Sequence, residues 1–345
     1  MKFRTAPAPH LPPASSVSSV MREVLIALIP AAVAYVWFFG WGLVFNIVIA
    51  TAFAVLFEAL MLKLRSKHLG PFLGDYSAIV AAVLLAFALP PLTPWWITVT
   101  GVAFAIVVAK HLYGGLGFNP FNPAMAAYAM LLVTFPLEMS IWLPPAIEDM
   151  ETSQVSAYAS LIAILTGSLP DGVPFDAISA ATALDYLKTG QAEMQTMGEM
   201  QTSPLFGSMG ARGWEWVANG FLLGGLWLMY KRIIRWHIPF SMLAGLFVIS
   251  GIFYAIDADA YTSPFFNIFS GATMIGAFFI ATDPVSTATS NRGRIIFGLG
   301  AGVLTYVIRT WGGYPDGVAF AVLIMNMTVP VIDHFTVPRI YGHEK

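Results

Sequence analysis

Cysteine is absent from the 345 residues of this chain. Its absence excludes a disulfide framework, an iron–sulfur cluster held by this chain alone, and a flavin or haem linked through a thiolate. Any redox centre must therefore be held through oxygen or nitrogen atoms. Histidine is also sparse, and no two histidines form a pair facing the membrane midplane, as a b-type haem would require; the six are His10, His68, His111, His237, His334 and His343.

Charged residues are scarce as well. They make up 10% of the chain, whereas hydrophobic residues make up 57%. Soluble domains carry about 25% charged residues, so this composition predicts an integral membrane protein with lipid as its surroundings. We expect no cleavable signal peptide, because residues 1–22 contain no apolar core, and no nucleic-acid partner.

Ten apolar segments are candidate membrane helices. Several are shorter than the roughly 20 residues of a straight span and end at proline or glycine, which predicts broken helices buried inside a packed bundle. The fold class expected is therefore an all-α integral membrane protein of about ten transmembrane helices. The expected spans are 24–39, 41–62, 76–91, 95–111, 121–136, 214–231, 239–257, 265–283, 294–311 and 317–334.

The basic residues predict the orientation of these spans. They gather in alternate loops, after the second, fourth, sixth and eighth spans and after the last one, and the positive-inside rule places those loops and both termini in the cytoplasm. The long polar segment 137–213 then lies outside, in the periplasm of a bacterial cell. The expected parts are a cytoplasmic tail (1–22), a first membrane repeat (23–136), the periplasmic loop (137–213), a second membrane repeat (214–334) and a cytoplasmic tail (335–345).

An internal repeat relates the two membrane parts. Pro90-Pro91 precedes Lys110 and a Gly-Gly pair in the first half, and Pro284 precedes Arg309 and a Gly-Gly pair in the second. Five spans per half make the second copy enter from the opposite side, so the halves are expected to be inverted repeats. Folds of this kind place their site on discontinuous helices at the repeat interface.

The periplasmic loop carries the most specific motif, with the spacing Asp176-x-x-Ser179-x-Ala181-Thr182. It resembles the flavinylation signal at which the phosphate of FMN is esterified to a threonine hydroxyl, although alanine replaces the usual glycine before Ala181. A covalently held flavin implies electron transfer, since the carrier stays in place through repeated turnovers. The residues after Thr182 predict a short helix, whose first backbone N–H groups would favour a phosphate.

Other polar features inside the membrane are weaker candidates. A second Ser-Gly-Ala-Thr string ends at Thr273, but it lacks the acidic residue and runs into a span, so we interpret it as a helix contact or as lining for a nearby flavin. Asn119 and Asn122 stand at a proline-broken helix start, where they could contact a second, noncovalent flavin or cap broken helices. Glu58 is the most interior carboxylate and a candidate for an ion path. No metal-ligand spacing, Walker motif or nucleophile–base pair is present.

Together these stretches resemble the D component of the Rnf complexes, which are ion-translocating ferredoxin:NAD oxidoreductases, and more distantly the B component of the Na+-translocating NADH:quinone oxidoreductases. The stretches that carry the resemblance are 114–125, 176–184, 270–286, 291–294 and 312–320. The resemblance implies FMN bound covalently to Thr182, which makes the chain a phosphoprotein, and a noncovalent riboflavin in the membrane part. It also implies a bacterial inner-membrane location, a flavin transferase for maturation, assembly with the A, B, C, E and G components of an Rnf complex, and electron transport coupled to Na+ or H+ movement.

Two other classes of protein remain open. A secondary transporter or channel of inverted-repeat fold without a redox role would explain the broken helices but not the motif at Thr182. A structural membrane scaffold would explain the hydrophobicity but not the polar breaks.

Overall fold

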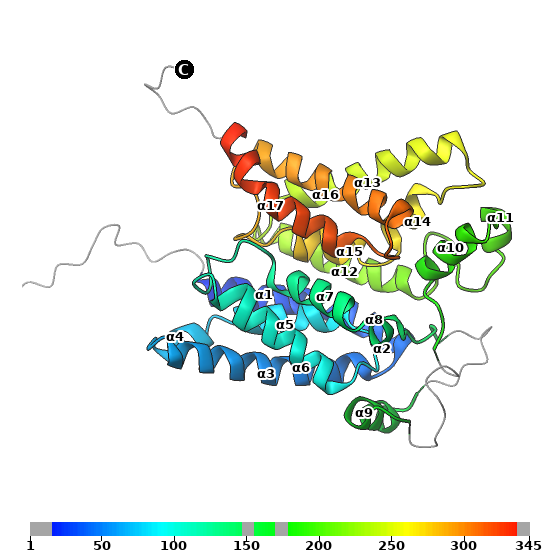
Figure 1. Ribbon diagram of the computed structural model, residues 1–345. Helices are drawn as coiled ribbons and strands as arrows, with labels where there is room; N and C mark the ends of the chain where they lie inside the picture. Colours follow the sequence, from blue (N-terminus) through cyan, green and yellow to red (C-terminus); the bar gives the residue numbers. More distant parts are fainter. Residues whose placement is uncertain (1–15, 147–154, 170–178, 337–345) are drawn as a thin grey trace, which may run out of the picture.

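The computed structural model describes residues 16–146, 155–169 and 179–336. These residues are helical and form no sheet, only an isolated bridge between Phe206 and Ala211. The expectation of an all-α protein is therefore confirmed for the described part of the chain. The helices form two groups, which lie one above the other in Figure 1.

The first group contains the helices that precede residue 135. Most of its members are apolar, and several end at or near proline, glycine or a basic residue. The elements are α1 (Val17–Ala27), α2 (Ile29–Phe39), α3 (Gly42–Leu64), α4 (Leu69–Leu73), α5 (Ser77–Ala88), α6 (Trp95–Ala103), the π-helix η1 (Phe104–His111) and α7 (Pro123–Thr134).

The second group begins after the polar segment. It consists of α12 (Trp214–Tyr230), α13 (His237–Ile256), α14 (Pro264–Phe269), α15 (Thr273–Ile275), the π-helix η3 (Gly276–Ile280), α16 (Asn291–Trp311) and α17 (Val318–Thr336). Within the described residues, four helical stretches are long and apolar enough to cross a membrane: Val17–Phe39, Gly42–Leu64, His237–Ile256 and Val318–Thr336. Each of the ten expected spans coincides with a helix or a broken helix. The spans outside these four stretches are shorter or less apolar than the four.

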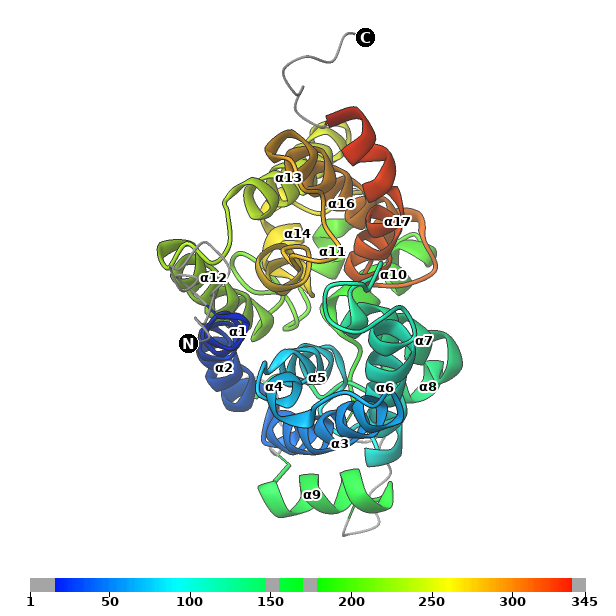
Figure 2. The same ribbon diagram turned by 90° about the vertical axis from the view of Figure 1, so that its left-hand side faces the viewer.

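The polar segment between the groups is partly helical. It contains α8 (Pro136–Ser140), α9 (Ala157–Thr166), α10 (Ala183–Ala192) and α11 (Met197–Met200). In Figure 1, α10 and α11 lie at the end of the molecule opposite α4; we call these the α10 end and the α4 end. Figure 2, in which most helices are seen end-on, shows α9 lying crosswise outside α3.

Buried side chains satisfy the main-chain groups where helices break. Beyond the end of α5, the carbonyl oxygens of Pro90 and Pro91 accept hydrogen bonds of 3.2 and 3.1 Å from Asn46 of α3. Beyond α14, the carbonyl oxygen of Ser270 accepts one of 3.0 Å from Arg309 of α16. An unpaired carbonyl group away from water costs several kcal/mol, on the order of a lost hydrogen bond or more, so these donors make the breaks tolerable.

The packing of the two groups follows one pattern. In the first, α3 packs against α5 and α6; in the second, α13 packs against α14 and α16. The long helices run in opposite directions, because α3 leads to the α4 end whereas α13 leads to a loop that contacts α11. An inverted repeat would bring its corresponding helices into opposite directions, and that repeat stays a prediction from the sequence.

Glycines permit close approach between α13 and α16. A Cβ atom on Gly298 would meet Ser241 and the main chain of α13, and one on Gly302 would meet the main chain of Met242. These glycines therefore allow the two helices to pack closely against each other.

Candidate functional site

Thr182 is the N-cap residue of α10, which confirms the helix expected directly after it. Its hydroxyl donates a hydrogen bond of 2.6 Å to Oδ2 of Asp185 and accepts one of 3.2 Å from the Asp185 backbone N–H. The Thr182 N–H in turn donates to the same carboxylate at 3.3 Å, which completes a capping box. Asp176, the acidic residue of the motif, lies outside the described residues, while Ser179 is half-buried and Ala181 is exposed.

Three hydrogen bonds hold the helix of Thr182 against the second helix group. Lys188 donates to the carbonyl oxygens of Arg309 and Tyr314, each at 3.1 Å. Further along α10, Gln191 donates to the carbonyl oxygen of Ala260 at 3.1 Å. These bonds fix the position of Thr182 relative to the helix bundle.

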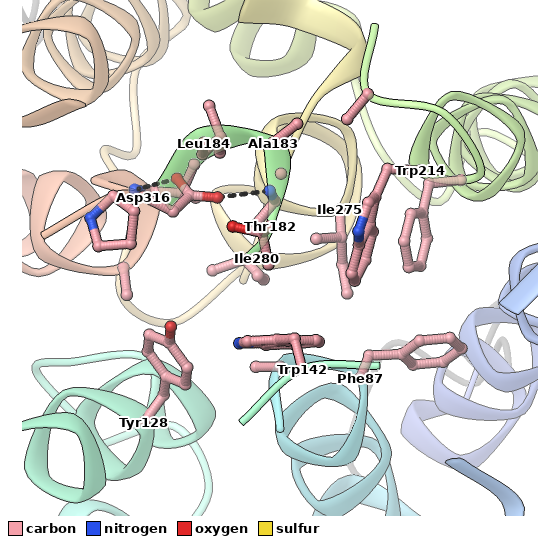
Figure 3. A pocket seen from close by; sticks show the side chains of 18 of the residues that line it. Phe87, Tyr128, Trp142, Thr182, Ala183, Leu184, Trp214, Ile275, Ile280 and Asp316 are labelled. Atoms are coloured by element: carbon pink, nitrogen blue, oxygen red, sulfur yellow. Dashed lines mark hydrogen bonds between the residues drawn. The ribbon is translucent and has the colours of Figure 1, made fainter. Parts of the chain in front are cut away.

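A cavity of about 110 Å³ opens beside Thr182, between the two helix groups. Figure 3 shows the hydroxyl groups of Thr182 and Tyr128 and the rings of Trp142 and Trp214 around this space. We call it the outer cavity. Its wall is mainly apolar and aromatic, with two carboxylates, and also includes Tyr35, Phe87, Phe221, Gly271, Ala272, Ile275, Ile280, Asp185 and Asp316.

The two carboxylates of the outer cavity have different surroundings. Oδ1 of Asp316 lies 3.1 Å from Nη2 of Arg309, and its Oδ2 accepts a bond of 2.6 Å from the Ala272 N–H. Asp185 has no ion pair within 4 Å among the described residues. Burial raises the pKa of Asp185 above its usual value, and the hydrogen bonds from Thr182 oppose that rise only in part.

The second Ser-Gly-Ala-Thr string forms part of the wall facing Thr182. Gly271 has a φ of 62°, and a Cβ atom there would meet Asp316, Leu184 of α10 and Arg309. The hydroxyl of Thr273 is buried and donates to the carbonyl oxygen of Asn267 at 2.9 Å. Thr273 thus holds the helix break between α14 and α15, while its neighbours Gly271 and Ala272 line the outer cavity.

A second cavity, of about 500 Å³, lies toward the α4 end. We call it the inner cavity. Asn119 and Asn122 both line it, together with Lys110, Phe278, Phe279 and Asp283. The π-helix η3 separates the two cavities, since Phe278 and Phe279 face the inner one and Ile280 the outer one.

Both asparagines of the inner cavity also bind main-chain groups near the start of α7, and Asn122 is the N-cap residue of that helix. The Oδ1 atom of Asn122 accepts from the N–H groups of Ala124 and Met125 at 3.0 and 3.2 Å, and its Nδ2 donates to the carbonyl oxygen of Ile280 at 3.3 Å. Asn119 donates to the carbonyl oxygen of Phe121 at 3.0 Å. The capping role considered from the sequence is confirmed for Asn122 but not for Asn119, and both side chains line the inner cavity.

Glu58 is buried in a charged cluster inside the first helix group. Its Oε1 accepts a bond of 2.8 Å from Lys110, and its Oε2 lies 3.0 Å from Nε2 of His111. Lys110 also donates to the hydroxyl of Ser77, at the start of α5, at 2.9 Å. In the second half, Arg309 likewise reaches a broken helix and a carboxylate, that of Asp316.

Comparison with known proteins decides the family. Residues 4–342 match the model of the NQR2, RnfD, RnfE family. A protein of Aliivibrio salmonicida, named as the D component of an ion-translocating oxidoreductase complex, is 50% identical over 352 residues, which cover all of both chains. Proteins of the same name from Pseudomonas aeruginosa strain UCBPP-PA14 and from Vibrio cholerae are 51% and 48% identical, over 98% and 99% of this chain and 95% and 100% of theirs.

The chain belongs to the NQR2, RnfD, RnfE family. The resemblance drawn from its motifs is confirmed, as is the function expected from it, that of a subunit of an ion-translocating oxidoreductase complex. The outer cavity, the inner cavity and the Glu58 cluster all lie within the residues that match the family.

The sequence does not indicate which other residues line the outer cavity beside Thr182. Tyr128, Trp142, Trp214 and Asp316 come from four separate segments, and no spacing along the chain relates them to Thr182. The contact between Thr182 and Asp185 does have a sequence signal, because a threonine followed three residues later by an acidic residue is a capping-box pattern.

Proposed function

We propose that this chain is the covalent-flavin subunit of an Rnf-type complex, with FMN esterified through its phosphate to Thr182. In this role it passes electrons between partner subunits while the complex moves Na+ or H+ across the membrane. The observation that carries the proposal is the position of the Thr182 hydroxyl, at the N-terminus of α10 and on the wall of the outer cavity. Full-length similarity to proteins named as the D component of such complexes gives independent support.

The residues around Thr182 fit a flavin phosphate. The N-terminus of a helix offers free N–H groups and a favourable dipole to an anion. Aromatic side chains such as those of Trp142 and Trp214 offer apolar faces to a planar ring system. When bound, the flavin supplies one- and two-electron redox chemistry, which no side chain of this chain provides.

A second, noncovalent flavin of the riboflavin type is proposed for the inner cavity. Its volume of about 500 Å³ lies within the range of ligand pockets. Asn119 and Asn122 are the polar groups on its wall that could orient such a ring. Thr273, the third residue considered for this contact, lies nearer the outer cavity, so we assign it to holding the helix break.

The proposed orientation places the α4 end in the cytoplasm and the α10 end in the periplasm. The separation of α4 and its flanking basic residues from Thr182 supports this assignment. Modification of Thr182 then requires a flavin transferase that works outside the cytoplasm.

The proposed partners are the A, B, C, E and G components of an Rnf complex, in a bacterial inner membrane. Glu58 is the proposed ion-path carboxylate, since it is a buried ionisable group close to two basic side chains.

The attachment site is tested by gel fluorescence after coexpression with a flavin transferase. We expect the parent chain to carry a yellow fluorophore that survives SDS, and Thr182→Val to lack it. Thr273→Val and Thr196→Val are the matched controls; Thr196 caps α11 as Thr182 caps α10, so its loss tests whether an uncapped helix alone abolishes labelling. Fluorescence that persists in Thr182→Val and disappears in Thr273→Val would refute the site.

The same experiment decides between the flavoprotein and a transporter without a redox role. A parent chain that never fluoresces with an active transferase present supports the transporter. The broken helices and the opposite directions of α3 and α13 fit a transporter as well as a flavoprotein. The result with the parent chain is therefore needed to distinguish these two functions.

A further inference from the structure

The polar segment contains two capping boxes with nearly the same geometry. In the first, the Thr182 hydroxyl donates to Asp185 at 2.6 Å; in the second, the Thr196 hydroxyl donates to Glu199 at 2.9 Å. In both, the hydroxyl accepts a bond from the N–H of the acidic residue, and the carboxylate accepts from the threonine N–H. Helix capping alone therefore does not distinguish Thr182 from Thr196.

The surroundings of the two carboxylates distinguish them. Asp185 lies on the wall of the outer cavity and is partly buried, whereas Glu199 is exposed. Burial raises the pKa of Asp185, while the hydrogen bonds from Thr196 lower that of Glu199. A carboxylate with a raised pKa accepts a proton more readily, so Asp185 is the stronger base of the two.

We propose that Asp185 accepts the hydroxyl proton of Thr182 when the flavin phosphate is attached, an inference that rests on the proposed function. The donor is a flavin–adenine dinucleotide held by the transferase. Oγ1 of Thr182 attacks the phosphorus next to the flavin ribityl group, the Oγ1–P bond forms, and the P–O bond of the pyrophosphate bridge breaks to release AMP. The proton passes from Oγ1 to Oδ2 of Asp185 and then to solvent, and no electrons are transferred.

Geometry singles out Asp185 for this step. Its Oδ2 is the atom to which the attacking hydroxyl already donates, at 2.6 Å, so the proton is aligned for removal. Asp316, the other carboxylate of the outer cavity, is bound by Arg309 and by the N–H groups of Ala272 and Val318. Its oxygens are therefore already taken up by donors.

The product also fits the same helix end. An ester oxygen at Thr182 can no longer donate a proton, so the hydroxyl bond to Asp185 is lost. The N–H groups of Thr182 and Asp185 that close the capping box then become free to bind the phosphate at the start of α10. After attachment the phosphate therefore replaces the Asp185 carboxylate and the Thr182 hydroxyl as the acceptor for these N–H groups.

The test measures the initial rate of flavin transfer onto purified full-length chain, produced without transferase, in detergent with transferase, FAD and Mg²⁺. Asp185→Asn keeps an acceptor for the capping box but is a much weaker base, and Glu199→Gln is its matched control. We expect Asp185→Asn to lower the rate on the order of 100-fold, the usual contribution of a general base, and Glu199→Gln to leave it unchanged. The ratio of parent rate to Asp185→Asn rate should rise with pH to a plateau.

A rate for Asp185→Asn within two-fold of the parent, or a ratio independent of pH, would overturn the proposal. If that variant fails to fold, the pH profile of transfer onto the parent chain is compared with the hydrolysis of FAD by the transferase alone. Profiles of the same shape would then overturn it. Two other outcomes would contradict the proposed function instead: a parent chain that takes up no flavin, or a Thr182→Val variant that takes up as much flavin as the parent chain.

Discussion

The ammonium group of Lys188 donates a hydrogen bond of 3.1 Å to the main-chain oxygen of Arg309, 121 residues further along the chain. Lys188 belongs to the helix that Thr182 begins, and Arg309 lies in the last turn of α16 of the second helix group. The side chain of Arg309 in turn binds Asp316, on the wall of the outer cavity. Lys188 therefore ties the proposed flavin-bearing helix to the part of the bundle that lines its cavity.

Replacing Lys188 by methionine is expected to loosen α10. The change keeps an apolar stem and removes the two hydrogen bonds to Arg309 and Tyr314. A hydrogen bond from a charged donor contributes about 1.5–3 kcal/mol, so amide hydrogen exchange in α10 should become faster by roughly 10- to 100-fold. Mass-spectrometric hydrogen exchange on the purified chain measures this.

Lys231→Met provides the control for that change. Lys231 is more exposed and lies 3.8 Å from Glu23, a pair that contributes little to stability. Exchange in α10 that is equal in both variants would show that Lys188 does not hold the helix in place.

The sequence predicted the helices better than it predicted the site. Apolar runs and proline breaks locate α3, α13 and the broken helices, because the hydrophobic pattern is a local property of the chain. The helix after Thr182 was also predictable, from the local residues that follow it. The crosswise helix α9 was not predicted, because its ten residues are too few for a membrane span.

The composition of the outer cavity could not be predicted. Tyr128, Trp142 and Trp214 line the same cavity as Thr182 because the two helix groups face one another. Periodicity indicates which face of a helix is buried but not which helix covers it. The same limit applies to Lys110, whose contact with Glu58 joins residues that are 52 positions apart.

Stability of α10 and α11 should respond to pH in opposite directions. Burial raises the pKa of folded Asp185 above its usual 3.8, so its contribution is complete below that pH and is lost as the pH rises through the folded pKa. Hydrogen bonds lower the pKa of folded Glu199 below 4.5, so its contribution is present above that pH and is lost as the pH falls through the folded pKa.

Hydrogen exchange between about pH 2.5 and about pH 7, corrected for intrinsic rates, measures this difference, because the Glu199 contribution is lost only toward the acid end. Protection of α10 should decline with rising pH in the parent chain and become flat in Asp185→Asn. A slope that survives in Asp185→Asn would assign the effect to another group.

The orientation is tested with a reporter enzyme that is active only outside the cytoplasm. Fusion near Gly190, in α10, should give activity, because this segment is proposed to be periplasmic. Fusion after Arg235, between α12 and α13, should be silent, since the basic residues there favour the cytoplasm. The reverse pattern would overturn the proposed orientation of both termini and of Thr182.

Variants of the buried pair Glu58 and Lys110 are expected to distinguish a role in stability from a role in ion movement. Glu58→Gln leaves the ammonium group of Lys110 buried without its ion-pair partner, which typically costs about 3–5 kcal/mol. Replacing both residues, as Glu58→Gln with Lys110→Met, removes the uncompensated charge and should recover much of that loss. Thermal unfolding of the purified chain measures both effects.

Ion translocation by the assembled complex then shows whether the carboxylate itself is used. If Glu58 belongs to the ion path, the double variant regains stability and keeps its covalent flavin but translocates ions as poorly as Glu58→Gln. If the cluster only packs the first helix group, translocation returns together with stability. Transport that is unchanged in a stable Glu58→Gln variant would likewise assign Glu58 to structure alone.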